Sequence, residues 1–166
     1  DTAIVAGRVL EENNYAAPAG KIVARWKDKM WLANSTTYPY RLWHSRGQYV
    51  GLDRLEQWDT DLDYLDIPAN GDGEEIMAFI PAPGGDFAVC LKEDSFYHVY
   101  ERSISSEGRF YDYERIAGIG CVGPDAWTVI DIEGFRGLAW LSPQGVMLYQ
   151  IGAEIQNITP GRINYG

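Results

Sequence analysis

Short apolar runs separated by polar corners follow one another along this chain, and the same order of runs occurs three times. The runs that open the three copies are KIVARW from Lys21, EIMAFIPA from Glu75 and AWTVIDIE from Ala126. Each is followed by a turn and by two further runs rich in Val, Ile, Trp, Tyr and Phe. Because these residues favour strands, the pattern predicts three small antiparallel sheets.

The copies are evenly spaced. Ile22 and Ile76 lie 54 residues apart at matching places in the first two copies, and Trp127 follows Ile76 by 51 residues. About four short strands in roughly 40–50 residues are typical of a β-propeller blade. One copy alone would also fit a β-sandwich, but three copies with similar turns favour the propeller. We place these three residues on the innermost strands of the blades.

We therefore predict an all-β, β-propeller-like fold of about three blades of antiparallel strands, in a single domain over residues 1–166. The approximate blades are 20–70, 71–120 and 121–160. Stacked blades bury each other's apolar sides, so a set of large strand residues is expected to lie buried between neighbouring blades. This set is Trp31, Phe87, Val89, Trp140, Leu148 and Tyr149.

The number of copies limits how the fold can close. A propeller usually has four or more blades, and a partial or fragment propeller leaves open strand edges that invite pairing with other strands. The chain begins with Asp1 rather than Met. We expect either a piece of a longer polypeptide or a protomer that closes against partners.

Charge and hydropathy argue against two classes of partner. The formal net charge is −10, from 24 acidic and 14 basic residues. Tight nucleic-acid binding relies on clustered Lys and Arg, which this chain lacks, so no tight nucleic-acid binding is predicted. No apolar run approaches the roughly 20 residues of a membrane helix, so no membrane partner is predicted either.

The two cysteines do not suggest a disulfide framework or a metal site. Cys90 lies inside an apolar strand and is interpreted as a small buried hydrophobic residue. Cys121 lies in the turn GIGCVGP. Both are predicted to be free thiols, and we predict no metal and no cofactor.

Closely spaced acids in WDTDLDYLD give one candidate cation site. Asp59, Asp61 and Asp63 resemble the beginning of a calcium loop. Tyr64 replaces the turn glycine of that loop, however, and Asn70 occupies the place of its bidentate acid. We interpret the three aspartates as the solvated face of a strand, with a cation site as the alternative.

Other candidate chemistry is weak. His44 and His98 occupy the third strand of their copies and have no Ser, Asp or Cys partner at a catalytic spacing, so packing is the preferred interpretation. The segment Gly71–Glu75 lacks the lysine and the helix of a phosphate loop and is predicted to be a turn. Paired carboxylates for glycoside cleavage remain open in so acidic a chain, but we predict no catalytic residue.

Five motifs in order resemble a known family. They are a Pro-containing link with RLWHS, a GDG turn into a strand, an aromatic strand pair, GCVGP and LSPQGV, at Tyr38–Ser45, Gly71–Ile76, Phe87–Tyr100, Gly120–Pro124 and Leu141–Val146. Together they are similar to the propeller region of tailed-bacteriophage tail structural proteins, the tail nozzle or hub class and its prophage relatives. The resemblance covers Ala17 to about Gly152.

The resemblance implies a non-catalytic virion structural protein, part of a tail assembly surrounding the DNA exit path. It implies sister subunits and other tail proteins as partners, a ring-shaped homo-oligomer, and location in the virion tail after assembly in the host cytoplasm. The alternative function is a carbohydrate-binding or carbohydrate-active β-propeller, which would use aromatic platforms and acids. A generic host interaction module is a third hypothesis.

Overall fold

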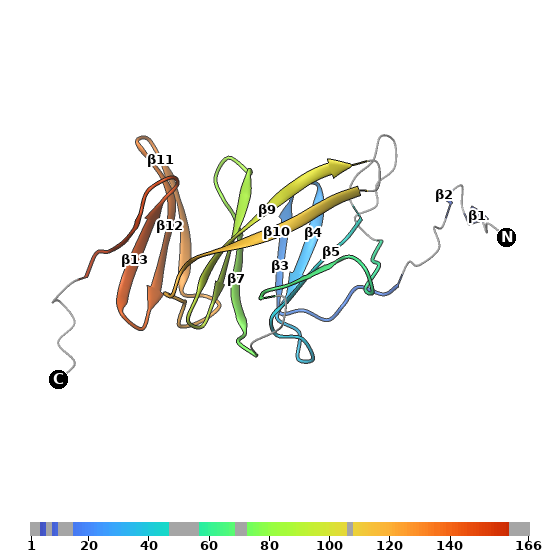
Figure 1. Ribbon diagram of the computed structural model, residues 1–166, viewed down its shortest axis with the longest axis horizontal. Helices are drawn as coiled ribbons and strands as arrows, with labels where there is room; N and C mark the ends of the chain where they lie inside the picture. The colour runs from blue at the N-terminus through green and yellow to red at the C-terminus, as the bar shows by residue number, and fades with distance from the viewer. Residues whose placement is uncertain are drawn as a thin grey trace.

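The computed structural model of the protein describes residues 4–5, 8–9, 15–46, 57–68, 73–105 and 108–159, with side chains placed in 15–46, 57–68, 73–102 and 110–159. Within these ranges the regular structure is entirely β. Three four-stranded antiparallel sheets lie side by side along the long axis (Figure 1). The predicted all-β class is confirmed.

Each sheet is a simple meander in which strands follow one another in chain order. The first sheet contains β3 (Ile22–Trp26), β4 (Lys29–Ala33), β5 (Arg41–His44) and β6 (Tyr64–Asp66). The second contains β7 (Ile76–Pro81), β8 (Phe87–Lys92), β9 (Phe96–Ser105) and β10 (Gly108–Ala117). The third contains β11 (Trp127–Ile132), β12 (Phe135–Ser142), β13 (Gly145–Gln150) and β14 (Ile155–Asn157). A separate short pair joins β1 (Ile4–Val5) and β2 (Arg8–Val9).

The arrangement is compatible with part of a propeller. The first strands of the first two sheets, β3 and β7, lie against each other. A polar tie reinforces this contact, because Asn34 Nδ2 donates to the carbonyl oxygen of Ile76 at 2.9 Å. The described residues form three neighbouring sheets and do not close a ring.

The second sheet is buried on both faces. Successive side chains of a strand point to opposite faces, so Phe79, Ala88 and Cys90 contact the first sheet while Ala78 and Val89 contact the third. A strand covered on both sides needs apolar residues at consecutive positions. The uninterrupted apolar run of β8 is explained by this double burial.

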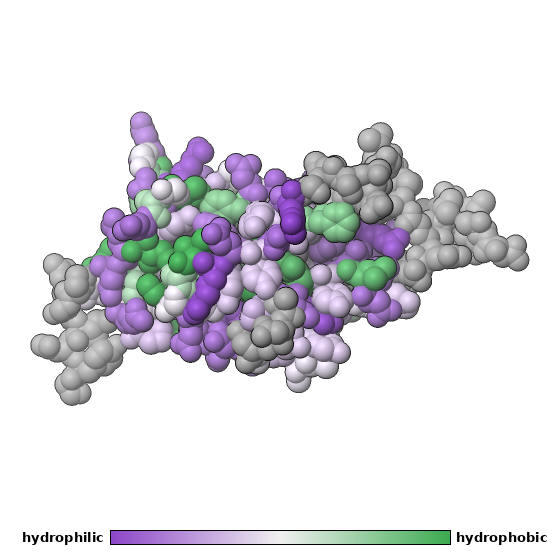
Figure 2. Space-filling view, viewed as in Figure 1, coloured by the Kyte–Doolittle hydropathy of each residue, from purple (hydrophilic) through white to green (hydrophobic). Residues whose placement is uncertain are grey.

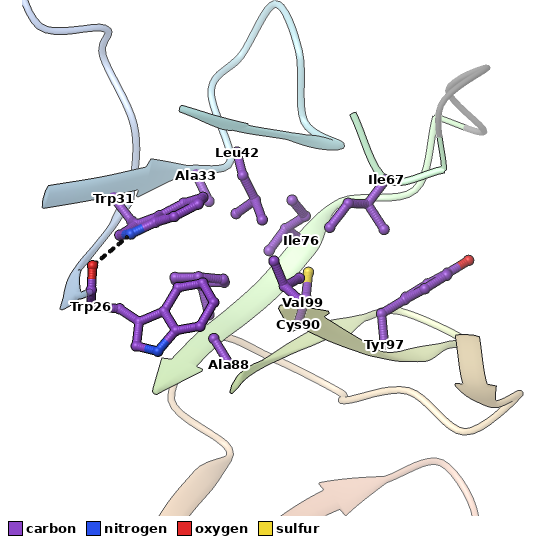
Figure 3. Packing of buried hydrophobic residues seen from close by; sticks show 11 residues of the cluster. Trp26, Trp31, Ala33, Leu42, Ile67, Ile76, Ala88, Cys90, Tyr97 and Val99 are labelled. Atoms are coloured by element: carbon purple, nitrogen blue, oxygen red, sulfur yellow. Dashed lines mark hydrogen bonds between the residues drawn. The ribbon is translucent and has the colours of Figure 1, made fainter. Parts of the chain in front are cut away.

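Large and small side chains complement each other between the first and second sheets (Figure 3). Trp31 packs against Trp26 and Phe79, with ring centroids 5.4 and 5.1 Å apart. Its indole Nε1 donates to the carbonyl oxygen of Trp26 at 3.0 Å. The small residues Ala88 and Cys90 belong to the same cluster, and their size leaves room for the two indoles.

The interface between the second and third sheets is built around Trp140. This residue is 2% exposed, its ring centroid lies 5.3 Å from that of Phe96, and its Nε1 donates to the carbonyl oxygen of Gly120 at 3.0 Å. Leu138 and Met147 are buried beside it.

Most of the side chains predicted to lie buried between sheets are buried. These are Trp31, Val89, Trp140 and Tyr149. Phe87 is half-buried at the interface between the second and third sheets. The prediction for Leu148 was wrong, because this half-buried side chain alternates with buried Met147 and Tyr149 and therefore points to the opposite, outward face of the third sheet.

The hairpin β9–β10 extends beyond its own sheet and leans across the first one (Figure 1). Only Phe96–Tyr100 of β9 pair with β8, while β9 and β10 pair with each other over nearly their whole length. Tyr111 of the hairpin lies 4.7 Å from Trp31 and 5.7 Å from Trp26, centroid to centroid. The second sheet therefore holds the first by both face packing and this hairpin.

Candidate functional site

His44 is part of the packed interior. Its ring centroid lies 5.0 Å from that of Trp31 and 5.1 Å from that of Tyr111. Its Nδ1 lies 3.2 Å from Nζ of Lys29 and 3.1 Å from the carbonyl oxygen of Ser45. Burial, and then the charge of Lys29, lower the pKa of His44 to about 3. The imidazole is therefore neutral at pH 7 and enclosed by packing partners.

Acidification is expected to destabilise the protein through His44. The pKa of this group is about 3 in the folded chain and about 6.5 in an unfolded chain. Between these values the unfolded chain binds more protons, so the free energy of unfolding falls as pH falls, by about 2 kcal/mol between pH 7 and pH 5. Burial lowers the pKa of His98 in the same direction. Urea denaturation of the wild type and of His44→Gln at both pH values tests this. The variant should lose less stability, and an equal loss would contradict the assignment to His44.

The aspartates predicted to share one face of a strand lie instead in a turn before β6. Asp59 is 2% exposed, and its Oδ1 accepts hydrogen bonds from the amides of Asp61 and Leu62 at 3.2 Å each. Arg46 reaches Oδ2 of Asp59 at 3.3 Å and Oδ2 of Asp63 at 3.7 Å. Of the three aspartates, only Asp61 is exposed to solvent as the sequence predicted. Asp59 caps the turn, and the guanidinium of Arg46 balances the charges of Asp59 and Asp63.

No group of three or more His, Cys, Asp or Glu side chains suited to a metal occurs in the part of the chain that the structure describes. Both cysteines are buried, and neither is in a disulfide. Cys121 Sγ donates to the carbonyl oxygen of Gly123 at 3.1 Å, and burial raises the pKa of this thiol. A raised pKa keeps sulfur in the weakly nucleophilic thiol form.

His98 also packs against aromatic rings. Its ring centroid lies 4.4 Å from that of Phe87 and 5.6 Å from that of Tyr149. Burial lowers its pKa, and Glu114 opposes this shift. Each histidine therefore lies at an interface between sheets, and the two occupy different interfaces.

A fully buried lysine ties the second sheet to the segment before it. Lys92 Nζ donates to the carbonyl oxygen of Ile67 at 2.9 Å and lies 3.9 Å from Oε2 of Glu74. The predicted turn Gly71–Glu75 lies partly outside the described residues. Its described part bends at Gly73, with φ of 83°, and supplies the carboxylate beside this lysine.

A groove of about 820 Å³ lies between the β7–β8 turn and the β11–β12 turn. Its lining includes Asp86, Asp131, Glu133 and the ring of Phe135. Arg136 also lines the groove, and its Nε is 3.1 Å from Oδ1 of Asp131. The groove is therefore acidic and offers one aromatic ring.

Among the residues that the structure describes, no further sheet covers the outward face of the first sheet. Val23, Leu32, Trp43 and Tyr64 pair in one row across β3 to β6, and paired residues of adjacent strands share a face. None of the four belongs to the interior clusters. We call this row the first-sheet end face. Val23 is 64% and Tyr64 38% exposed, whereas Trp43 is buried, with 5% exposed.

An arginine sandwich borders the first-sheet end face. The guanidinium carbon of Arg41 lies 3.7 Å from the ring centroid of Tyr64 and 4.2 Å from that of Tyr38. Its Nη2 donates to Oδ2 of Asp66 at 2.8 Å, and Nε donates to the other carboxylate oxygen. The hydrogen bond with Asp66 raises the pKa of Arg41. Because the guanidinium lies over both tyrosine rings, the three side chains form a polar-aromatic surface.

The outward face of the third sheet likewise has no neighbouring sheet within the described ranges. Its rows are Thr128–Ala139–Leu148 and Leu141–Val146. We call these residues, together with Ile130, the third-sheet end face. Leu141 is 43% exposed, and hydrophobic surface is prominent over the third sheet in Figure 2.

The sequence did not predict the arginine sandwich or the two end faces. Arg41 and Asp66 are 25 positions apart, so no local motif joins them. The signal for the third-sheet end face lay in β12 and β13, where apolar residues occupy consecutive positions in LAWL and VMLY instead of alternating with polar ones. Such runs indicate a sheet with two apolar faces.

Within the ranges that the structure describes, no helix is long and apolar enough to cross a membrane. A scan against protein-family models found no match, and a search of curated proteins found no significant relative.

Proposed function

We propose that this chain is a non-catalytic structural part of a bacteriophage tail, in a nozzle-like or hub-like assembly around the DNA exit path. The observation that carries the proposal is the pair of outward sheet faces, which expose Val23 and Leu141, on a stack whose middle sheet is buried on both sides. Such a stack is suited to joining further sheets. The five motifs that resemble tail proteins supply the biological setting.

Charge supports a role beside DNA without tight binding. The formal net charge of −10 repels phosphates, so DNA passing such a surface would gain little binding energy. The proposed partners are sister subunits in a ring and other tail proteins, and the proposed location is the virion tail after assembly in the host cytoplasm.

Antibody labelling of intact virions tests the tail assignment directly. An antibody raised against this chain should label the tail in electron micrographs, and preimmune serum is the matched control. Labelling of the capsid shell, or none on virions in which the chain is detected, would contradict the proposal. Binding of duplex DNA should be weaker than micromolar at physiological salt. Turnover of a glycoside or ester that disappears in His44→Gln or Asp131→Asn would contradict the non-catalytic role.

The groove between the β7–β8 and β11–β12 turns favours the second candidate function, carbohydrate binding. Phe135 provides one apolar ring, and Asp131 and Arg136 provide hydrogen-bonding groups. Sugar sites commonly combine such a ring with polar groups. Titration with oligosaccharides, followed by Phe135→Ala, separates this candidate from the structural role.

A further inference from the structure

Side chains attach the outer part of the β9–β10 hairpin to the first sheet. Beyond Tyr100, β9 no longer pairs with β8, and in the described part of the chain neither β9 nor β10 pairs with a strand of the first sheet. The hairpin lies across that sheet (Figure 1), and Tyr111 and Tyr113 pack against the hydrophobic cluster between the first and second sheets. An element attached in this way can lift from the sheet while its own strand pairing stays intact.

Tyr111 packs against two side chains that can carry charge. Its ring centroid lies 5.1 Å from that of His44, and Nζ of Lys29 lies 5.5 Å from the same tyrosine centroid. Lys29 and His44 are both buried, and Nζ is 3.2 Å from Nδ1 of the imidazole. The neutral imidazole can accept a hydrogen bond from the ammonium group, whereas an imidazolium brings two cations together at that distance.

Ionisable groups from two further elements lie near this pair. The turn before β6 contributes Asp63 and Asp59, whose charges Arg46 balances. On β9, Glu101 pairs with Tyr111 and therefore shares the face of the hairpin that is turned to the first sheet. Burial raises the pKa of Asp63, so the folded chain gains stability when this carboxylate is protonated, which opposes the effect of the imidazole. Variants that change the imidazole alone separate the two effects.

We propose that the β9–β10 hairpin is an acid-released latch on the first sheet, and that protonation of His44 releases it. The imidazolium is held against Lys29 beneath Tyr111, and lifting the hairpin relieves the repulsion by admitting water to both cations. The released state exposes the indoles of Trp31 and Trp26, against which Tyr111 packs in the closed state. This conformational device goes beyond the proposed structural role and does not depend on it.

The expected response covers a defined pH range. The pKa of His44 is about 3 in the closed state and approaches the ordinary value of about 6.5 once water reaches the ring. The open state therefore binds more protons, so opening becomes more favourable as pH falls from about 6.5 toward about 3. Between pH 7 and pH 5 the ratio of open to closed molecules rises by up to about 25-fold.

Hydroxyl-radical footprinting of the full chain at pH 7 and pH 5, with oxidation of each residue measured by mass spectrometry, tests the release. Oxidation of Trp31, which is 1% exposed in the closed state, should rise at least about fivefold at pH 5. Trp140, 2% exposed at the other interface, is the internal reference and should change by less than about twofold. In Tyr111→Ala, Trp31 should be oxidised readily at both pH values, because the ring that covers it is missing.

The two histidines provide matched variants. His44→Gln keeps an acceptor for Lys29 but cannot titrate, so the rise at Trp31 should disappear. His98→Gln removes the histidine of the other interface, and the rise at Trp31 should remain. Should circular dichroism show that His44→Gln does not fold, Lys29→Met replaces it. This variant removes the second cation, so the rise at Trp31 should fall by at least about half.

Three outcomes would overturn the inference. Unchanged oxidation of Trp31 between pH 7 and pH 5 means that acid does not release the hairpin. Equal rises at Trp31 and Trp140 mean that the whole stack loosens and that no latch opens. A rise that persists in His44→Gln, or that is undiminished in Lys29→Met, means that another group responds to the acid.

Discussion

Replacing Trp140 with alanine is expected to lower the free energy of unfolding by about 3–5 kcal/mol, the usual range for a large buried aromatic residue. The side chain is 2% exposed between the second and third sheets. Its loss removes the contact with Phe96 and leaves the carbonyl oxygen of Gly120 without its indole donor. Denaturant melts at pH 7 measure the change.

Leu141→Ala is the matched control for Trp140→Ala. Leu141 follows Trp140 by one residue on β12 but lies on the outward face and is 43% exposed. Its replacement should cost less than about 1 kcal/mol, because much less surface is buried there. A loss below about 1 kcal/mol for Trp140→Ala itself would show that the indole does not contribute a core contact.

Gly120→Ala is expected to cost about 3 kcal/mol, the upper part of the range for overpacking. A Cβ at this position would lie 2.0 Å from the carbonyl oxygen of Glu93 and 2.4 Å from the amide nitrogen of Asp94. Both atoms belong to the backbone of the β8–β9 turn, which cannot rotate away as a side chain would. The same change displaces the carbonyl that accepts from Trp140. The melting midpoint in urea is the measurement.

Gly123→Ala provides the control for Gly120→Ala within the same motif. A Cβ at Gly123 would have no heavy atom within 4 Å, so its effect should stay within about 0.5 kcal/mol. Equal losses for the two variants would mean that chain flexibility, rather than the close approach to the β8–β9 turn, determines the requirement for glycine at position 120.

The three sheets could be predicted because their information is local. Each strand pairs with its neighbours in the sequence, so the alternation of apolar residues and the spacing of Ile22, Ile76 and Trp127 were sufficient. The direction of single side chains was harder. Leu148 lies among apolar residues that serve both faces of a strand, and composition does not tell which face a neighbouring sheet covers.

Pairings between distant residues could not be predicted. The acids at 59–63 read as a strand because their spacing alternates, but the hydrogen bonds of Asp59 and the charge of Arg46 favour a turn. Likewise, nothing near Tyr111 indicates that its ring packs on Trp31. These contacts depend on how the sheets meet in space, and one sequence does not encode that in any local pattern.

The reach of the β9–β10 hairpin has a consequence for the order of folding during synthesis. Chains emerge from the ribosome N-terminus first and can fold segment by segment, so the strands of the first sheet are available before those of the second. The indoles of the first sheet, Trp26 and Trp31, are however buried by Phe79 and then by Tyr111, which both belong to the second sheet. The aromatic surface of the first sheet therefore stays exposed to solvent until the nascent chain has extended past Tyr111. A chaperone that binds exposed apolar surface would act mainly during this interval.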